Sequence, residues 1–209
     1  MKNRRHLSRL GLGVVVAALG AAPAHAATKP VNTSMCNTTP VFSQPFLSWQ
    51  DTNSYTLVPG QTADSFSGAG WVLSGGAKIV SATLADGMTG SVLDMPAGAQ
   101  AVSPTICVES DYPDARMMVS NLSGSNSGKM DFAVSYAGTN TATTPQQTGT
   151  FKTTGNQGVR GGWLLSQPAD MQPGTAPGWQ PMQITLTQSG PKKSEFQIYN
   201  LYVDPRSSW

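Results

Sequence analysis

The sequence predicts an all-β protein, an antiparallel β-sandwich of jelly-roll type with about ten short strands and one disulfide. The first observation behind this prediction is a series of short apolar runs, separated by turn signals about every 8–15 residues. The second is composition: the chain holds 22 Gly and 15 Pro, and only 11% of its residues are charged. Frequent Gly and Pro with few helix-forming residues favour strands and turns over helices.

Two runs near the end of the chain show the strongest period-two alternation. Residues 129–136 are expected to place one apolar set on a single face: Met130, Phe132, Val134 and Tyr136. The closing run 195–204 is expected to present Phe196, Ile198, Asn200 and Tyr202 on one face. Its other face would then carry Gln197, Tyr199, Leu201 and Val203. Earlier, Gly75 and Gly76 separate the apolar runs 71–74 and 77–84, which predicts a hairpin.

The first 26 residues have the pattern of a removable secretory signal. Positive charges come first, an uncharged apolar run at 10–22 follows, and Ala24-His25-Ala26 supplies a small-x-small cleavage pattern. The apolar run is shorter than the roughly 20 residues of a membrane-spanning helix. We expect a signal peptide at 1–26, a polar lead at 27–40, a β-sandwich domain at 41–205 and a tail at 206–209. The protein is expected to be secreted, without a stable membrane span.

Removal of this signal would change the chemistry open to the protein. Both histidines, His6 and His25, lie in the removed segment, which excludes Ser–His–Asp catalysis and imidazole-bound metals. The mature chain would keep nine basic residues against eleven acidic ones, so it has no basic face for nucleic acid. We therefore lean towards a protein that is not an enzyme.

Cys36 and Cys107 are the only cysteines in the chain. In an exported protein, two cysteines most simply form one disulfide. The alternative is a pair of buried free thiols. A bond between them would close a loop of about 70 residues and stabilise the fold by about 4 kcal/mol.

Exposed aromatic side chains are the main indication of a ligand site. Trp49, Tyr112 and Trp179 lie near turns or strand ends, where a flat ring can stack on a sugar. The alternative is ordinary core packing, which we favour for the aromatic residues overall, and above all for Trp71 and Trp163 because each begins a strand after a glycine. Trp179, in a loop rich in Pro and Gly, is the better exposed candidate.

Acidic residues offer two further chemistries. Glu109, Asp111 and Asp114 cluster within six residues, as in oxygen-rich calcium loops, although a solvated turn is the interpretation we favour. No cofactor is therefore expected. A catalytic carboxylate pair is the other option, but no motif selects two members from the acidic residues, most of which stand beside turn residues.

Several short motifs together resemble a group of secreted proteins from actinobacteria and related soil bacteria. They run from Ser43-Gln44-Pro45-Phe46, through Gly70-Trp71-Val72-Leu73-Ser74-Gly75-Gly76-Ala77 and Pro96-Ala97-Gly98, to Tyr202-Val203-Asp204-Pro205. The resemblance implies a jelly-roll or galactose-binding-like sandwich and an extracellular setting, and no catalytic or ligand residue. In that setting Arg116 is expected to form a structural ion pair with Asp204 or Asp51.

Three functions follow as hypotheses. The first is a secreted, non-catalytic module that binds extracellular carbohydrate or a cell-wall polymer. The second is a carboxylate-dependent polysaccharide hydrolase or lyase, which would need two acidic side chains facing each other across a cleft. The third is a surface module that binds another protein through an exposed apolar patch.

Overall fold

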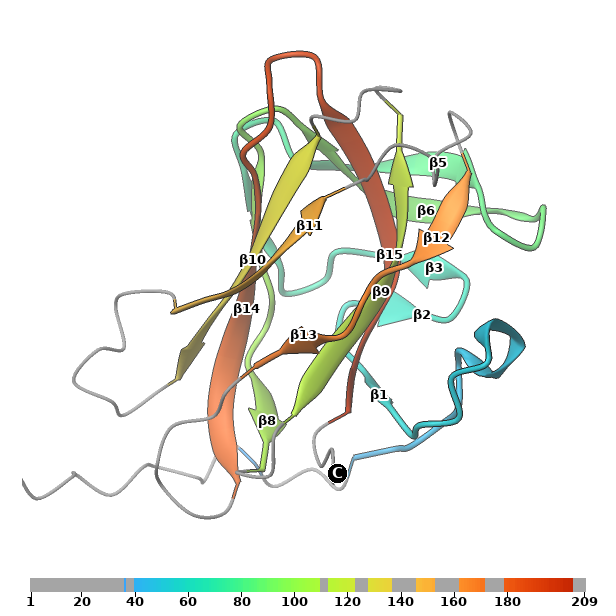
Figure 1. Ribbon diagram of the computed structural model, residues 1–209, viewed down its shortest axis with the longest axis vertical. Helices are drawn as coiled ribbons and strands as arrows, with labels where there is room; N and C mark the ends of the chain where they lie inside the picture. Colours follow the sequence, from blue (N-terminus) through green and yellow to red (C-terminus); the bar gives the residue numbers. More distant parts are fainter. Residues whose placement is uncertain are drawn as a thin grey trace, which may run out of the picture.

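The computed structural model describes Cys36 and residues 40–109, 113–122, 128–136, 146–152, 162–171 and 179–204, with 146–152 as backbone only. In these residues the secondary structure consists of strands and one 3-10 helix, η2 (Leu47–Trp49), without an α-helix. The strands form two sheets that pack face to face (Figure 1). The predicted all-β sandwich is thereby confirmed.

Nine strands form the larger sheet. Their order is β12-β9-β15-β6-β3-β2, with β1 beside β15, β13 beside β9 and β5 beside β6. Their bounds are β1 (Thr56–Leu57), β2 (Gln61–Thr62), β3 (Ser65–Phe66), β5 (Lys78–Thr83), β6 (Thr89–Pro96), β9 (Asp114–Asn121), β12 (Trp163–Leu165), β13 (Ala169–Asp170) and β15 (Glu195–Asp204). β3 and β6 pair in parallel, through Ser65 and Ser91, in an otherwise antiparallel sheet.

Six strands form the smaller sheet, in the order β11-β10-β14-β7-β4 with β8 beside β14. Their bounds are β4 (Val72–Ser74), β7 (Gln100–Val102), β8 (Ile106–Val108), β10 (Lys129–Tyr136), β11 (Gln146–Lys152) and β14 (Gln180–Gln188). All of its pairings are antiparallel.

The main hydrophobic core fills the space between the sheets. Leu93 and Phe196 of the larger sheet and Phe132, Ile184 and Leu186 of the smaller sheet are completely buried in it. Burying such a side chain stabilises the fold by about 1.5–3 kcal/mol. β10 supplies the most regular set: Met130, Phe132, Val134 and Tyr136 are all buried, and the residues between them are half-buried. The predicted alternation of this strand is confirmed.

The predicted hairpin at Gly75-Gly76 is wrong. β4 pairs with β7 in the smaller sheet, whereas β5 pairs with β6 in the larger sheet. The two glycines therefore carry the chain from one sheet to the other. Gly75 has a φ of 62°, and a Cβ there would lie 2.2 Å from the carbonyl oxygen of Gly98. Only glycine fits this close approach of two backbones.

The expected faces of the closing strand hold only for its first half. The pairing of β15 with β9 shifts register between Tyr199 and Tyr202, and Asn200 adopts a φ of 51°. Such a bulge inserts one extra residue and reverses the alternation that follows. Phe196, Ile198, Leu201 and Val203 consequently face the main core. Tyr199 and Tyr202 join a second apolar cluster, in contrast to the predicted grouping of Tyr202 with Phe196.

This second cluster lies where residues 41–55 cover part of the larger sheet. Phe46 packs edge-on against Tyr55 and Tyr202, with ring centroids 5.3 and 5.5 Å apart. An isolated bridge between Ser43 and Tyr55 closes the segment into a loop. Figure 1 shows the segment, coloured blue, on the side of the larger sheet away from β10 and β14. We call residues 41–55 the N-terminal loop.

The predicted disulfide is confirmed. Cys36 and Cys107 are bonded, with Cα atoms 5.5 Å apart and 71 positions between them in the sequence. Cys107 lies on β8 in the smaller sheet, so the bond ties the chain just before the N-terminal loop to the opposite layer of the sandwich. In the chain-entropy model, closing such a loop stabilises the folded protein by about 4 kcal/mol. In the described residues no helix is long and apolar enough to cross a membrane.

Candidate functional site

A groove of about 400 Å³ opens on the outer side of the larger sheet. Three loops surround it: the N-terminal loop, the turn between β2 and β3, and the turn between β5 and β6. Strands β9 and β15 supply its floor. Its lining residues are Pro45, Phe46, Ser48, Trp49, Ala63, Asp64, Ala85, Asp86, Met118, Tyr199 and Asn200. We call this space the Trp49 groove.

Trp49 is the exposed aromatic side chain of the groove. It ends the short helix η2 and leaves 41% of its surface open to solvent. The loop under it is well anchored, because Phe46 is 1% exposed and accepts, through its carbonyl oxygen, hydrogen bonds from the backbone N–H groups of Trp49 and Asp51. The indole face is therefore presented by a fixed backbone.

Tyr199 forms part of the floor and is held on two sides. Its ring meets Trp163 edge-on, with centroids 4.6 Å apart, and its hydroxyl accepts a hydrogen bond of 3.2 Å from the backbone N–H of Ala85. Trp163 in turn donates its indole N–H to the carbonyl oxygen of Thr83 at 2.7 Å. Burial raises the pKa of the Tyr199 hydroxyl, and the nearby charges of Asp86 and Asp64 raise that pKa further.

Asn200 also lines the groove, at the bulge of β15. The bulge gives this residue its left-handed backbone, a conformation that asparagine tolerates better than most side chains. Its Oδ1 atom is shielded from solvent and has no hydrogen-bond partner among the described residues. An unsatisfied buried acceptor costs about 1–3 kcal/mol, and such exceptions to local rules concentrate at functional sites.

Two exposed carboxylates belong to the groove lining. Asp64 follows β2 and Asp86 lies in the turn between β5 and β6. Asp86 also shapes its own turn, because its Oδ1 atom accepts a hydrogen bond of 2.9 Å from the backbone N–H of Met88. The groove lining contains no lysine or arginine. Its formal charge is therefore negative.

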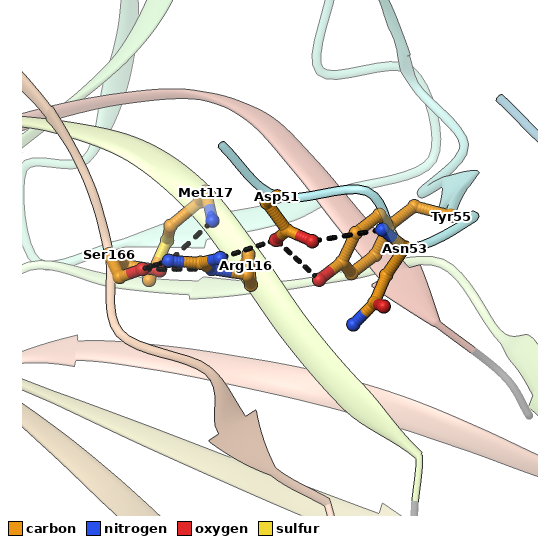
Figure 2. A network of polar contacts seen from close by, with 6 residues as sticks. All are labelled: Asp51, Asn53, Tyr55, Arg116, Met117 and Ser166. Carbon is orange, nitrogen blue, oxygen red and sulfur yellow. Dashed lines mark hydrogen bonds and ion pairs between the residues drawn. The ribbon is translucent and has the colours of Figure 1, made fainter. Parts of the chain in front are cut away.

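A polar network fixes the N-terminal loop to the sheet beside the groove (Figure 2). Arg116 on β9 forms an ion pair with Asp51 of the loop through its Nη1 atom. Its Nε and Nη2 atoms donate to the carbonyl oxygen of Ser166 at 3.0 and 2.8 Å. Ser166 is itself locked to β9, because its hydroxyl oxygen accepts a hydrogen bond of 3.1 Å from the backbone N–H of Met117.

Asp51 is the hub of this network. It accepts hydrogen bonds from the hydroxyl of Tyr55 at 2.8 Å and from the backbone N–H of Asn53 at 3.0 Å, besides the one from Arg116. Desolvation by burial raises the pKa of the carboxyl, but the hydrogen bonds from Asn53, Tyr55 and Arg116 outweigh it, and the net pKa is lowered. The guanidinium charge on this face is thus neutralised within the fold.

The sequence-predicted residues fall in different places. The structure joins Arg116 to Asp51, whereas Asp204 lies at the end of β15, opposite Asp114 in the strand register. Trp49 lines the groove described above. Trp179 lines a smaller pocket of about 110 Å³, beside Cys107 and Val203. Tyr112 and Asp111 lie outside the described residues, as does the predicted signal peptide.

Acidic residues come together on three neighbouring strands at one end of the larger sheet. Asp114 on β9 is opposite Asp170 on β13 and Asp204 on β15. Burial raises the pKa of the Asp114 carboxyl, and the charges of Asp170 and Asp204 raise it further. Even so, no group of three or more acidic, Cys or His side chains with the geometry of a metal site occurs among the described residues. The calcium candidate built on Glu109, Asp111 and Asp114 stays a hypothesis.

The groove itself was not predicted. Asp64, Asp86, Tyr199 and Asn200 are spread over more than half of the sequence, and no motif joins them. The nomination of Trp49, as an aromatic residue near a turn or strand end, was the one sequence prediction that fell in this groove. Trp71, for which we favoured the core, is 8% exposed and packs against Phe66.

Comparison with known proteins gives structural neighbours only. No protein-family model matches the sequence, and no curated protein matches it. The CBM22-1 xylan-binding domain of Xyn10C from Paenibacillus barcinonensis is 13% identical, with 66% of this chain and 88% of that chain covered and a TM-score of 0.46. A xylan-binding domain from CBM 22 is 15% identical, with 70% and 94% covered and a TM-score of 0.46.

A family 6 carbohydrate-binding module from Clostridium cellulolyticum, solved in complex with xylose, is a further neighbour. It is 14% identical, with 60% of this chain and 85% of that chain covered and a TM-score of 0.41. At these scores the likeness carries no argument about the ligand of this chain. The resemblance to secreted actinobacterial proteins stays a prediction, because no matching sequence tests it.

Proposed function

We propose that this protein is a secreted, non-catalytic carbohydrate-binding protein and that the Trp49 groove is its ligand site. The observation that carries the proposal is the exposed indole of Trp49 at a groove of about 400 Å³. A sugar ring presents C–H groups on one face, and these pack well on an aromatic π-surface. A volume of several hundred Å³ matches the usual size of small-molecule sites.

The polar groups of the groove support the same function. Asp64 and Asp86 carry exposed hydrogen-bond acceptors, and sugar hydroxyls are donors that would meet them. An aromatic platform with a few fixed polar groups is the usual composition of a site that orients a polar ring. The firmly anchored N-terminal loop lowers the entropy cost of presenting the platform.

Export is the second part of the proposal. The predicted signal at 1–26 and the Cys36–Cys107 bond together support an extracellular setting, because disulfides persist in oxidising compartments. A polymeric or cell-wall glycan is the carbohydrate that an exported binding protein would meet there.

A hydrolase is the competing function, and one observation favours it: Asp64 and Asp86 line the same groove. A glycosidase needs one carboxyl that burial keeps protonated so that it can act as a general acid. Both side chains here are exposed to solvent, and Asp86 also holds its own turn. The surroundings of the two carboxylates therefore support binding over catalysis.

A glycan-array screen on the mature protein tests the proposal, followed by calorimetry on the best oligosaccharide with wild type, Trp49→Ala and Val72→Ala. Val72 is a matched control, since it is an exposed apolar residue (65%) on the opposite sheet. We expect Trp49→Ala to weaken binding at least tenfold and Val72→Ala to leave it unchanged. Glycan binding that survives Trp49→Ala, or the absence of binding to any glycan, would overturn the proposal.

A further inference from the structure

The Trp49 groove offers acceptors and negative charge but no cationic side chain. Asp64 and Asp86 contribute two exposed carboxylates, and the lining holds no lysine or arginine. A site of this kind is poorly suited to an anionic ligand, because carboxylates of the ligand would meet carboxylates of the protein. It is well suited to a ligand that carries donors and positive charge.

Arg116 does not offset the negative charge of the groove, although it lies on β9 only two residues before Met118 of the groove floor. Its Nη1 atom is paired with Asp51, and its Nε and Nη2 atoms donate to the carbonyl of Ser166. A guanidinium with these three donor atoms engaged within the fold has little left to offer an anionic sugar. The negative charges of Asp64 and Asp86 have no such internal cation: the ion pairs of the described residues involve Lys78, Arg116 and Lys129 with other aspartates.

The charges of both carboxylates reach the floor of the groove. Burial is the main cause of the raised pKa of the Tyr199 hydroxyl, and the charges of Asp86 and Asp64 add to it. A cation placed above Tyr199 would therefore interact with Asp64 and Asp86 together. An indole face such as that of Trp49 also attracts cations.

We infer that the Trp49 groove selects amino sugars with a free, protonated amine, as in a glucosamine oligomer, over their N-acetylated, neutral and acidic counterparts. The inference rests on the proposed carbohydrate-binding function. An ammonium group has three donors and no acceptor, which complements the exposed carboxylates of Asp64 and Asp86. The sugar ring that carries it would stack on Trp49, so that stacking gives general sugar affinity and the acceptors give selectivity for the amine.

The test is calorimetry with four oligosaccharides of equal length: β-linked glucosamine, N-acetylglucosamine, xylose and galacturonate. The titrations are run at about pH 5.5, where ordinary aspartates are ionised. We expect the glucosamine oligomer to bind about tenfold or more tightly than the N-acetylated one, and the galacturonate oligomer to bind weakest. The advantage of the glucosamine oligomer should shrink when salt is raised, because exposed charges are screened.

The double variant Asp64→Asn/Asp86→Asn assigns the selectivity. Asparagine keeps the Oδ1 acceptor that the turn of Asp86 needs for Met88, and a thermal melt checks the fold. We expect this variant to lose most of the preference for the free amine, so that the glucosamine and N-acetylglucosamine oligomers bind within about twofold of each other. Asp170→Asn on β13 is the matched control and should keep the preference.

The outcomes separate this inference from the proposed function. Equal or tighter binding of the N-acetylated or neutral oligomer to the wild type would overturn the inference and leave carbohydrate binding standing. A preference for the amine that persists in Asp64→Asn/Asp86→Asn would also overturn it. If none of the four oligomers binds and the glycan array is also negative, both the inference and the proposed carbohydrate-binding function are refuted.

Discussion

Arg116 and Asp51 form an ion pair across 65 positions of sequence, and this pair holds the N-terminal loop against strand β9. The side chains are 15% and 8% exposed, so the pair is largely withdrawn from water. Because Trp49 stands two residues before Asp51, the same pair fixes the position of the groove's aromatic platform. Fold stability and the proposed site are thus connected through one contact.

The first prediction concerns this pair. We expect Arg116→Ala to destabilise the protein by about 3 kcal/mol, because it leaves the Asp51 carboxylate buried without its cation and the Ser166 carbonyl without its two donors. Asp51→Asn should also be destabilising, and a double-mutant cycle should give a clear coupling energy between the two positions. Urea unfolding measures all three variants. Asp204→Asn is the control, because Asp204 is the other carboxylate that the sequence analysis considered as a partner of Arg116. Losses of unfolding free energy that simply add for Arg116→Ala and Asp51→Asn would contradict the pairing.

The second prediction is the pH dependence of stability that Asp51 confers. Its folded pKa is lowered, so the unfolded state binds more protons as pH falls. The contribution of Asp51 is then complete above the ordinary aspartate pKa of about 3.9 and is lost as pH falls through the lower folded pKa. Melting temperatures between about pH 7 and pH 2.5 should therefore converge for wild type and Asp51→Asn at the acid end. A gap between the two that stays constant over this range would refute the assignment.

Asp114 should affect the pH dependence of stability in the opposite direction to Asp51. Burial and the charges of Asp170 and Asp204 raise its folded pKa, so its ionised form costs stability above that pKa, and the cost disappears as pH falls. We expect Asp114→Asn to raise the melting temperature at neutral pH by a few degrees and to match wild type in acid. A lower melting temperature at neutral pH would mean that the carboxylate is stabilising.

The disulfide gives a fourth test. Cys36→Ser/Cys107→Ser should lower the free energy of unfolding by about 4 kcal/mol, since it frees the chain over 71 positions of sequence. Reduced wild type should then unfold at the same urea concentration as the double variant. A large difference between these two samples would show that the serine substitutions act through something other than the lost bond.

Substitutions of Asn200 distinguish effects on stability from effects on ligand binding. Asn200→Gly should keep or slightly raise the melting temperature, because glycine adopts a φ of 51° without steric cost. The same variant removes a side chain that lines the groove, and we expect several-fold weaker ligand binding by calorimetry. Asn200→Ala removes most of the same side chain but should lose about 1 kcal/mol of stability, since alanine is strained in this conformation. Full binding by both variants would exclude Asn200 from the site.

Local pattern predicted the strands well where a strand keeps one face on the core. β10 alternates throughout because the main core covers one side of it along its whole length. The failures came from non-local packing. A Gly75-Gly76 pair between two apolar runs is typical of a hairpin. In the structure, however, β4 pairs with β7 and β5 pairs with β6, so β4 and β5 do not pair with each other. The alternation of β15 breaks at Asn200, where pairing to β9 forces a bulge that no residue pattern marks.

The groove was harder to predict for the same reason. Its walls come from three turns and two strands, and only the fold brings Asp64 and Asp86 to Tyr199 and Asn200. Trp49 was nominated as one of several aromatic residues near turns or strand ends. The sequence favoured Trp179, which stands in a loop rich in Pro and Gly, as the better exposed candidate. Trp179 nevertheless lines the smaller pocket beside Cys107, whereas Trp49 is 41% exposed.

The most direct test of the central claim is an NMR titration of the labelled mature protein with the oligosaccharide that binds best. The protein has five tryptophans, whose indole N–H signals can be followed separately. We expect the Trp49 indole and the amides of Asp64, Asp86 and Asn200 to shift with a common dissociation constant, while Trp71 and Trp179 stay unmoved. Shifts centred on Trp179 and Cys107, with the Trp49 signal unchanged, would contradict the account.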